Sequence, residues 1–548
     1  MWSQNYTPVG GSLGLSAVVA CLPLFVTLLL LAGFKKPAWV AALSGAVTAF
    51  LVAIIVYGMP ASMAISTVGF GAAYGLLPIT WIIFTAILLY RLTVETGKFE
   101  IIKDSVGSLT VDRRLQALLI AFAFGAFLEG ASGFGTPVAV AAAMLTGMGF
   151  SPFYAAAICL LANTAPVAFG AIGTPLVMLQ TVTGLPMGDL SANVGRICAP
   201  LSVIVPGYLM LVMGGWGALR AVFPAAIVCG VAFGGVQFLV SSFVGPYLTD
   251  ILGSLVALLA LVVLLKVWHP KEAEARPQSK YSPGQILLAW SPYIFLVIFV
   301  LLWNPDWMTV VAPQGGKTVA DFIKTHLNML TWKFGWPGLH NLVLRMPPVT
   351  KAATPYDATY TFNPGAASGT ACLMAVFAAA IASRVSPLDL LKYIGQTAKQ
   401  LALPTVTVMS VLALAYMMNY SGATATLGLT FAATGVMFPF FSSLLGWVAV
   451  FLTGSDTSAN ALFGSLQVVT AQKLAMNPAL MAAANSSGGV MGKMISLQNI
   501  AVASVATGMS QSEESKLFRF TLRHSVTMAV AIGLLVMVYA YVVPGWVR

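Results

Sequence analysis

The feature that most constrains this chain is the recurrence of long apolar runs from one end to the other. Examples lie at 16–33, 38–57, 221–240 and 525–543. A helix needs about 20 consecutive apolar residues to cross the hydrocarbon core of a bilayer, so each of these runs is suited to be a transmembrane helix. Only 8% of the residues are charged, whereas a soluble globular domain is about 25% charged. The sequence therefore predicts a helical protein with many membrane crossings.

Charge and composition argue against several other classes of protein. The net charge of +11 does not indicate nucleic-acid binding, because no basic cluster with interleaved aromatic residues occurs. The lysines and arginines lie mainly in loops, where they orient helices in the membrane. The five cysteines have no CxxC spacing and the four histidines lie in or near loops, so we expect neither disulfides nor a metal site. GGKT at 315–318 lacks the earlier glycine of an ATP-binding loop, and no cofactor is expected.

The distribution of Lys and Arg between loops predicts twelve crossings with both termini outside. Two regions do not fit as crossings, because each consists of two apolar stretches of about 15 residues, shorter than a span requires. The first region, 115–149, has the polar tip EGASGFG, and the second, 441–473, has the tip TGSDTSA. Such a pair is typical of a re-entrant hairpin, which is tolerated at membrane depth only inside protein or around a cavity.

The two hairpins belong to halves of the chain that resemble each other. Similar residues recur in the same order at nearly constant separation: Gly97 with Gly422, Gly130 with Gly454, and Asn163 with Asn485. Basic residues gather at 91–114 in the first copy and at 384–399 in the second, which are opposite ends of the repeat. Equivalent ends should therefore face opposite sides of the membrane. Inverted repeats of this kind are typical of secondary transporters.

These patterns divide the chain into five parts. We expect a first transmembrane helix within 1–36, a first repeat at 37–215, connecting helices at 216–303, a long extracytoplasmic loop at 304–365, and a second repeat at 366–548. The first repeat should contain a hairpin at 114–150 and a broken helix at 153–181; the second, a hairpin at 438–473 and a broken helix at 478–508. The predicted fold is all-α, with about twelve transmembrane helices plus two re-entrant hairpins in two inverted repeats.

Two acidic residues stand out because they fall at the expected bilayer depth. Glu129 and Asp456 each lie at a hairpin tip, whereas the other acids fall in loops, near span ends or in polar segments. A charge at the bilayer centre costs roughly 2.5–3.5 kcal/mol even on the lenient scale. We therefore predict that one or both of these carboxyl groups take up a co-transported proton. The alternative is a structural role in capping the helices of the hairpin.

Polar residues at the tips and breaks are the candidates for substrate binding. They are Ser132, Gly133, Thr136, Asn163, Thr164, Ser455, Thr457, Ser458, Asn460, Asn485 and Ser486. Helix N-termini at such breaks carry partial positive charge and suit a small carboxylate, although small residues also simply permit close helix packing. Lys493 is the deepest cation suited to this site, with either a substrate carboxylate or a hairpin acid as its partner. Arg196 is better suited to an interfacial or structural role.

Several motifs together resemble one known family. NYTPVGGS, GAFLEGASGFGTPVAV, NTAPVAFGAIGTP, FLTGSDTSANALF and GGVMGKMIS are similar to the bacterial L-lactate permease family over nearly the whole chain. The resemblance implies import of lactate, and commonly glycolate, with protons across the bacterial inner membrane. It also implies two opposed hairpins and two broken helices around one site. The chain departs from the expected pattern at Leu497, where a proline would follow MIS, so the exact place of the second break is open.

Together these features predict a symporter of protons with L-lactate, D-lactate and glycolate, embedded in a bacterial inner membrane. A sodium-coupled symporter of short-chain carboxylates is the nearest alternative, because Ser, Asn and Asp oxygens also bind hard cations. A membrane-embedded enzyme is disfavoured, since no His/Asp, Cys/His or metal constellation is expected at depth. The partners are thus a small carboxylate, the proton and the lipid bilayer.

Overall fold

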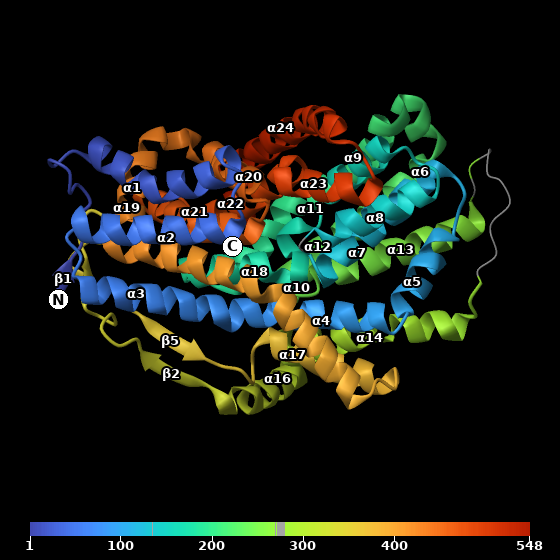
Figure 1. The fold of residues 1–548 in the computed structure, drawn as a ribbon, viewed down its shortest axis with the longest axis horizontal. Coiled ribbons are helices and arrows are strands. Elements are labelled where there is room, and N and C mark those ends of the chain that lie inside the picture. Colours follow the sequence, from blue (N-terminus) through green and yellow to red (C-terminus); the bar gives the residue numbers. More distant parts are fainter. Residues whose placement is uncertain (134, 269, 271–279, 548) are drawn as a thin grey trace.

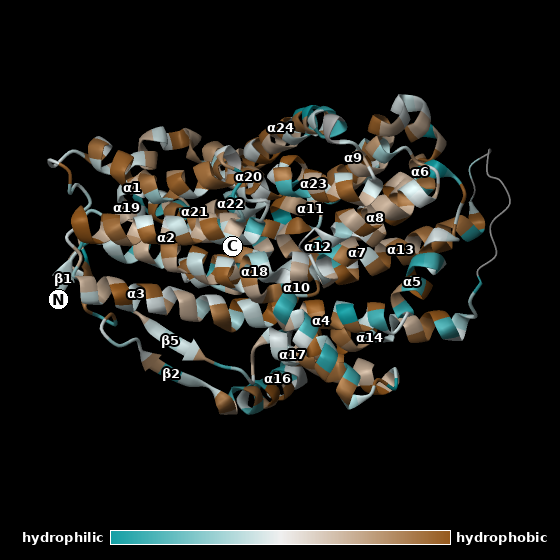
Figure 2. Cartoon of the chain, viewed as in Figure 1, coloured by the Kyte–Doolittle hydropathy of each residue, from teal (hydrophilic) through white to brown (hydrophobic). Residues whose placement is uncertain are grey.

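The computed structural model describes residues 1–133, 135–268, 270 and 280–547. In this part of the chain eleven helices are long and apolar enough to cross a membrane, or twelve if the bent pair Pro152–Ala162 and Val167–Thr183 forms one span. The prediction of a helical membrane protein with many crossings is confirmed. Figure 2 shows apolar residues along the helices, with hydrophilic residues at α5 and near the start of α24. The loop residues Lys271 and Arg276 lie outside the described residues.

The chain enters the membrane region through four helices. They are α1 (Leu13–Leu28) with η1 (Leu29–Gly33), α2 (Ala38–Ile55), α3 (Ala61–Tyr74) with η2 (Gly75–Thr80), and α4 (Trp81–Glu95). Pro37 and Pro60 precede α2 and α3 at their N-caps, where proline's missing N–H costs no helical hydrogen bond. Inside η2, Leu77 leaves the helical region just before Pro78, so α3 and α4 form one long kinked rod (Figure 1).

The region of the first expected hairpin and broken helix is a series of short helices. They are α5 (Lys98–Gly107), α6 (Arg113–Gln116), η3 (Ala117–Phe124), α7 (Gly125–Ala131), α8 (Thr136–Gly147), α9 (Pro152–Ala162), η4 (Val167–Phe169) and α10 (Gly170–Thr183). In the arm Arg113–Ala131, 94% of the residues in an apolar stretch of 18 are buried inside the protein. The arm is therefore surrounded by other helices rather than by lipid, which is the environment that a polar tip at depth requires.

Four longer helices connect the two halves. They are α11 (Met187–Ala221), α12 (Phe223–Phe243), α13 (Thr249–Val267) and α14 (Pro283–Trp303). The path of α11 breaks at Gly214 and Gly215, which leave the helical region. The helix α13 packs against α7, so the connecting helices contribute to the wall of the first hairpin.

Residues 304–365 form a small folded unit. It contains α15 (Asp306–Val311), α16 (Pro313–Leu327), η5 (Asn328–Leu330), β2 (Trp332–Gly335), β3 (Val343–Arg345), β4 (Thr354–Pro355) and β5 (Thr359–Phe362). The N-terminal strand β1 (Trp2–Ser3) pairs parallel with β3, which pairs antiparallel with β4, and β2 pairs antiparallel with β5. These short strands are an addition to the expected all-α fold. The unit is tied to the helices, since Trp336 and Tyr360 donate hydrogen bonds to carbonyls of α3 and η2.

The second half repeats the order of short and long helices. Its elements are α17 (Ser368–Ala382), α18 (Pro387–Ser421), α19 (Ala423–Phe431), η6 (Ala432–Met437), α20 (Phe438–Thr453), α21 (Asp456–Lys473), α22 (Pro478–Gly492), η7 (Lys493–Ile495), α23 (Leu497–Thr507), α24 (Gln511–Tyr541) and η8 (Pro544–Trp546). The helix α18 packs against α2 and α3 (Figure 1), so N-terminal and C-terminal segments share one helical layer.

The helices α20 and α22 are in very close contact. A Cβ atom at Gly446 would lie 1.8 Å from the carbonyl oxygen of Asn485, and one at Gly488 would lie 2.0 Å from that of Ser443. Both distances are far below van der Waals contact, and in each case the atom that the added Cβ would meet belongs to the backbone of the other helix. Glycine at these positions is therefore what lets the two helices touch.

We expect Gly446→Ala and Gly488→Ala each to destabilise the protein, because the added methyl group forces the two backbones apart at a cost of about 1–3 kcal/mol or more. The melting temperature of the purified protein in detergent should fall for both. The matched control is Gly188→Ala in the first turn of α11, where the added Cβ meets nothing within 4 Å. Melting temperatures equal to that of the control would contradict this packing.

Candidate functional site

The two hairpin tips and the two helix breaks surround one small cavity of about 80 Å³. Its lining residues are Glu129, Gly133, Gly135, Val167, Gly170, Ala171, Pro175, Gly454, Ser455, Asp456, Thr457, Lys493, Gln498 and Asn499. A single water needs roughly 10–15 Å³ of such space. The cavity therefore has room for several waters or for an organic acid of a few heavy atoms.

Four helices begin at this cavity. The N-terminal residues or N-caps of α8, α10, α21 and α23 are among its lining residues or adjoin them. Helix N-termini present backbone N–H groups and a partial positive charge. Side chains satisfy some of these N–H groups, since Ser455 accepts from the N–H of Ser458 and Ser496 from that of Asn499. The convergence of four N-termini still favours an anion over a cation in the cavity.

A buried ion pair links the first hairpin to the second half of the chain. Lys493 Nζ lies 2.6 Å from Glu129 Oε1, with the side chains only 8% and 3% exposed. Asn163 Nδ2 donates to Glu129 Oε2 at 3.0 Å. The sequence allowed either a substrate carboxylate or a hairpin acid as the partner of Lys493. The structure shows the hairpin acid Glu129 in this place. Gly170 makes room for the pair, because a Cβ there would lie 2.5 Å from Glu129 Oε1.

The second acid, Asp456, is held at one oxygen by a chain of polar side chains. Its Oδ2 accepts from Ser486 Oγ at 2.6 Å and from Asn460 Nδ2 at 3.4 Å. Asn460 Oδ1 in turn accepts from Asn485 Nδ2, and Asn485 Oδ1 accepts from Gln467 Nε2, both at 3.0 Å. The other carboxylate oxygen of Asp456, Oδ1, is buried without a hydrogen-bond partner among the described residues.

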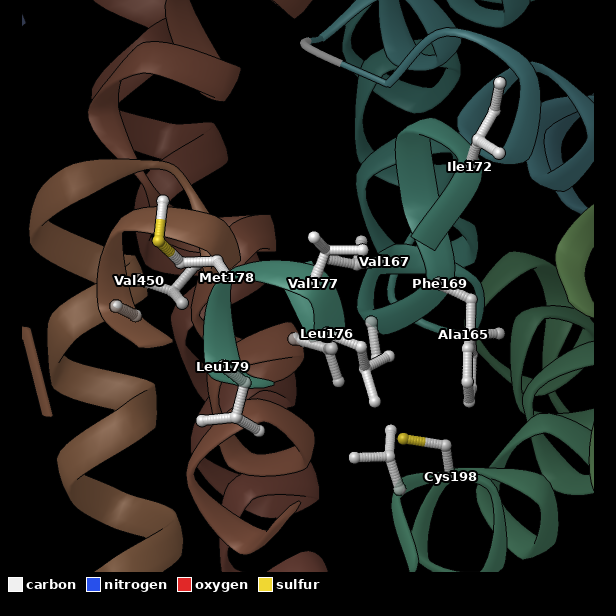
Figure 3. Close-up of a cluster of buried hydrophobic side chains, with 14 of the residues drawn as sticks. Ala165, Val167, Phe169, Ile172, Leu176, Val177, Met178, Leu179, Cys198 and Val450 are labelled. Carbon is white, nitrogen blue, oxygen red and sulfur yellow. The ribbon is translucent and has the colours of Figure 1, made fainter. Parts of the chain in front are cut away.

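The first broken helix turns through an unusual backbone conformation. Ala171, Ile172 and Gly173 have φ of 45°, 55° and 71°, in the left-handed region that a β-branched residue such as isoleucine rarely adopts. Each such non-glycine residue costs of the order of 1–3 kcal/mol and is kept only when its surroundings enforce it. Figure 3 shows buried apolar side chains of the segments before and after this turn, among them Val167, Leu176 and Val177, which lie together, while Ile172 lies apart from them.

The break of the first half also contacts the tip of the second hairpin. Asn460 Nδ2 donates to the carbonyl oxygen of Pro175 at 3.1 Å. The Thr174 hydroxyl donates to the carbonyl of Ala171 and helps to hold the turn. Elements of both halves are thus joined by direct contacts on both sides of the cavity, through Asn460 on one side and Lys493 on the other.

The predicted site residues fall into two groups. Those that line the cavity are Glu129, Gly133, Ser455, Asp456, Thr457 and Lys493. Those that do not line it are Ser132, Thr136, Asn163, Thr164, Ser458, Asn460, Asn485 and Ser486. Among the second group, Ser132 and Thr164 are buried and donate to carbonyls of their own helical turns, whereas Asn163, Asn460, Asn485 and Ser486 position the two acids.

Sequence reasoning missed four polar residues of this region. Gln498 and Asn499 line the cavity directly after the second break, and Gln467 ends the amide chain. Gln467 could have been found, because it lies two helical turns after Asn460 on the same face of α21. Asp250, in the first turn of α13, is 1% exposed although it was assigned to a span end. Its burial depends on the packing of α13 against α7, which the sequence does not reveal.

A second space lies beside the cavity. It measures about 250 Å³, and Ser455, Thr457 and Gln498 line both. Thr457 and Ser458 line this wider space, together with Trp39 and Thr80. A small solute in the central cavity would therefore meet the second hairpin tip first if it came from this side.

Comparisons with known proteins were made for the whole chain. The family model described as L-lactate permease matches residues 16–543. The chain is 45% identical to glycolate permease GlcA of Escherichia coli K12, with 99% of each chain covered, and 45% identical to the L-lactate permease of Bacillus subtilis, with 99% and 100% covered. It is 43% identical to the L-lactate permease of E. coli K12, with 99% and 98% covered.

Solved structures of membrane transporters resemble it more distantly. The YdaH transporter of Alcanivorax borkumensis has a TM-score of 0.45 at 15% identity, with 88% of each chain covered. MtrF of Neisseria gonorrhoeae has a TM-score of 0.45 at 13% identity, with 90% of this chain and 85% of that chain covered.

The geometry predicts how stability responds to loss of the buried ion pair. Lys493→Met leaves the Glu129 carboxylate buried without its cation, which typically costs about 3–5 kcal/mol. The double variant Glu129→Gln/Lys493→Met also removes the carboxylate, so its melting temperature in detergent should be higher than that of the single variant.

Lys324→Met is the matched control for this experiment. Lys324 pairs with Asp306, but both side chains are well exposed, at 45% and 65%, so its loss should change stability little. A Lys493→Met protein as stable as this control would show that the buried pair does not stabilise the fold.

Proposed function

The chain belongs to the L-lactate permease family, and on this premise we propose that it imports L-lactate, together with D-lactate and glycolate, in symport with protons across a bacterial inner membrane. The names of relatives that are 43–45% identical over the whole chain support lactate and glycolate as substrates. The observation that carries the proposal is the small cavity where four helix N-termini, a buried lysine and two buried acids converge.

The substrate carboxylate would bind at the helix N-termini and near Lys493. Both supply positive potential without a metal ion or a cofactor. The substrate hydroxyl would face the hydroxyls of Ser455 and Thr457, which line the same cavity. Because the cavity is only about 80 Å³, it favours short hydroxy acids over longer ones.

The proton would be handled by Asp456 and Glu129. Asp456 lines the cavity, is 3% exposed, and has one carboxylate oxygen that accepts no hydrogen bond from the described residues. A buried carboxylate near a bound anion is strongly disfavoured unless it binds a proton. Glu129 is neutralised by Lys493 in this state, so it would require a proton only when the substrate draws Lys493 away.

The arrangement of the hairpins supports alternating access to the site. Each half of the chain contributes one hairpin tip and one broken helix to the cavity, and the expected repeats have opposite sense. We propose that the cavity opens to one side of the membrane at a time as these elements move against the remaining helices. The wider space beside Ser455, Thr457 and Gln498 would be part of one such opening.

Transport of labelled L-lactate into proteoliposomes tests the coupling ion. One pH unit, acidic outside, is equivalent to about 1.4 kcal/mol and supports about tenfold accumulation for one proton per lactate. We expect accumulation that follows the pH gradient and is unchanged when sodium is replaced by choline. Accumulation that requires a sodium gradient would instead favour the sodium-coupled alternative.

We expect Asp456→Asn to abolish accumulation driven by the pH gradient, because an amide cannot bind and release the proton. The readout is the ratio of internal to external lactate at steady state, which should fall to unity. Asp321→Asn, at an exposed position on α16, is the control and should accumulate lactate like the wild type. Undiminished accumulation by Asp456→Asn would remove Asp456 from the coupling role.

A further inference from the structure

A third acid lies beside the ion pair. Asp250 is in the first turn of α13 and is 1% exposed. The charged or titratable groups that act on it from the described part of the chain are Glu129 of α7, Lys493 of η7 and the Cys198 thiol of α11. Asp250 therefore belongs to the same electrostatic centre, although it comes from the connecting helices rather than from a hairpin or a broken helix.

Two glycines of the site allow the start of α13 to approach this closely. A Cβ at Gly130, next to Glu129, would lie 2.8 Å from Cβ of Asp250. A Cβ at Gly173, in the strained turn of α10, would lie 3.0 Å from the Pro246 side chain. The segment 245–250 thus packs between the first hairpin tip and the first helix break. This packing places Asp250 next to the site.

The carboxyl group of Asp250 has no structural role that its contacts would explain. An acid in the first turn of a helix normally interacts with free backbone N–H groups. Here both carboxylate oxygens are buried, and neither has a hydrogen-bond partner among the described residues. A buried carboxylate without partners is strongly disfavoured in its ionised form, so the surroundings of Asp250 favour its protonated form.

We propose that Asp250 is a proton-binding residue of the coupling centre, and that it takes up the co-transported proton before the substrate carboxylate binds near Lys493. The inference rests on the proposed proton symport and places the single transported proton on Asp250 in the loaded site, with Asp456 and Glu129, which line the cavity, passing it to and from Asp250. The proton comes from water on the acidic side and forms an O–H bond with one carboxylate oxygen. That bond breaks after the site opens to the other side, and the proton returns to water there.

Charge conservation explains why a proton at this position couples to the substrate. With Asp250 ionised and the protonation state of Asp456 unchanged, the acids Glu129 and Asp250 and the single Lys493 leave one negative charge. With Asp250 protonated and a carboxylate substrate bound, the same group again has one negative charge. If the substrate bound without a proton, the same group would carry two negative charges, and buried charge in the membrane is costly. The empty site and the site loaded with both proton and substrate can therefore change the side of the membrane to which they open. The site loaded with substrate alone cannot.

The test compares accumulation with exchange in proteoliposomes. Asp250→Asn imitates the protonated acid, so labelled lactate should still exchange with internal unlabelled lactate at the wild-type rate. Its accumulation under one pH unit should fall from about tenfold to unity, because a neutral amide releases no proton inside. Lactate affinity of the purified variant should also depend less steeply on pH, since ionisation of Asp250 can no longer weaken binding as the pH rises.

Asp189→Asn is the matched control, because Asp189 also lies in the first turn of a spanning helix but is partly exposed. It should accumulate lactate like the wild type. If the wild type itself shows no accumulation with the pH gradient, the proposed symport fails. If the wild type accumulates lactate and Asp250→Asn does so equally, only the role of Asp250 fails.

Loss of both exchange and accumulation in a folded Asp250→Asn protein would overturn the proposal in favour of a structural role. Should Asp250→Asn fail to elute as a single species, Asp250→Ser, which is smaller and also neutral, takes its place with the same expected results. Unchanged pH dependence of lactate affinity in either folded variant would likewise overturn the role of Asp250.

Discussion

The buried ion pair between Glu129 and Lys493 is the interaction on which the centre of this protein depends. Glu129 belongs to the first hairpin and Lys493 to the second helix break, so their contact fixes how the two halves meet. Because the pair is almost fully buried, either residue alone would leave an uncompensated charge in a low-dielectric interior. Under the proposed function, a carboxylate substrate competes with Glu129 for this lysine, which connects binding to rearrangement of the site.

Interrupted helices make such a centre possible. A continuous helix satisfies all its backbone groups and offers none to a ligand, whereas a break at depth exposes N–H groups that need a partner. Here four helices start at one cavity. The turn at Ala171 and Ile172 carries backbone strain, which the buried surroundings of these residues must balance. Close contacts at glycines, such as Gly446 against Asn485 and Gly130 against Asp250, hold these interrupted segments in register.

Much of this arrangement is predictable from the sequence, and its failures have physical causes. The helical membrane fold follows from hydropathy, and the polar tips from the rarity of acids and amides in apolar segments. The first break lies at η4, within the expected broken helix. The second lies at η7, after Asn485 and Ser486, which are inside the continuous helix α22 rather than at the break. Gln467 was overlooked although its helical spacing from Asn460 was visible. The burial of Asp250 was not predicted, because this residue lies near the end of a span. Another helix covers that end, so the position of a residue along the span does not indicate its burial.

The sequence by itself determined that this chain crosses the membrane many times, that a helix is interrupted in each half, and that polar residues gather near these interruptions. These properties are local, since hydropathy and breaking residues act over one or two helical turns. Only the tertiary structure decided which of these polar residues meet. Lys493 pairs with Glu129, Asn460 reaches Pro175, and Asp250 lies against Gly130. Partners separated by more than a hundred residues are brought together by helix packing, which depends on the shapes of all the surrounding side chains at once.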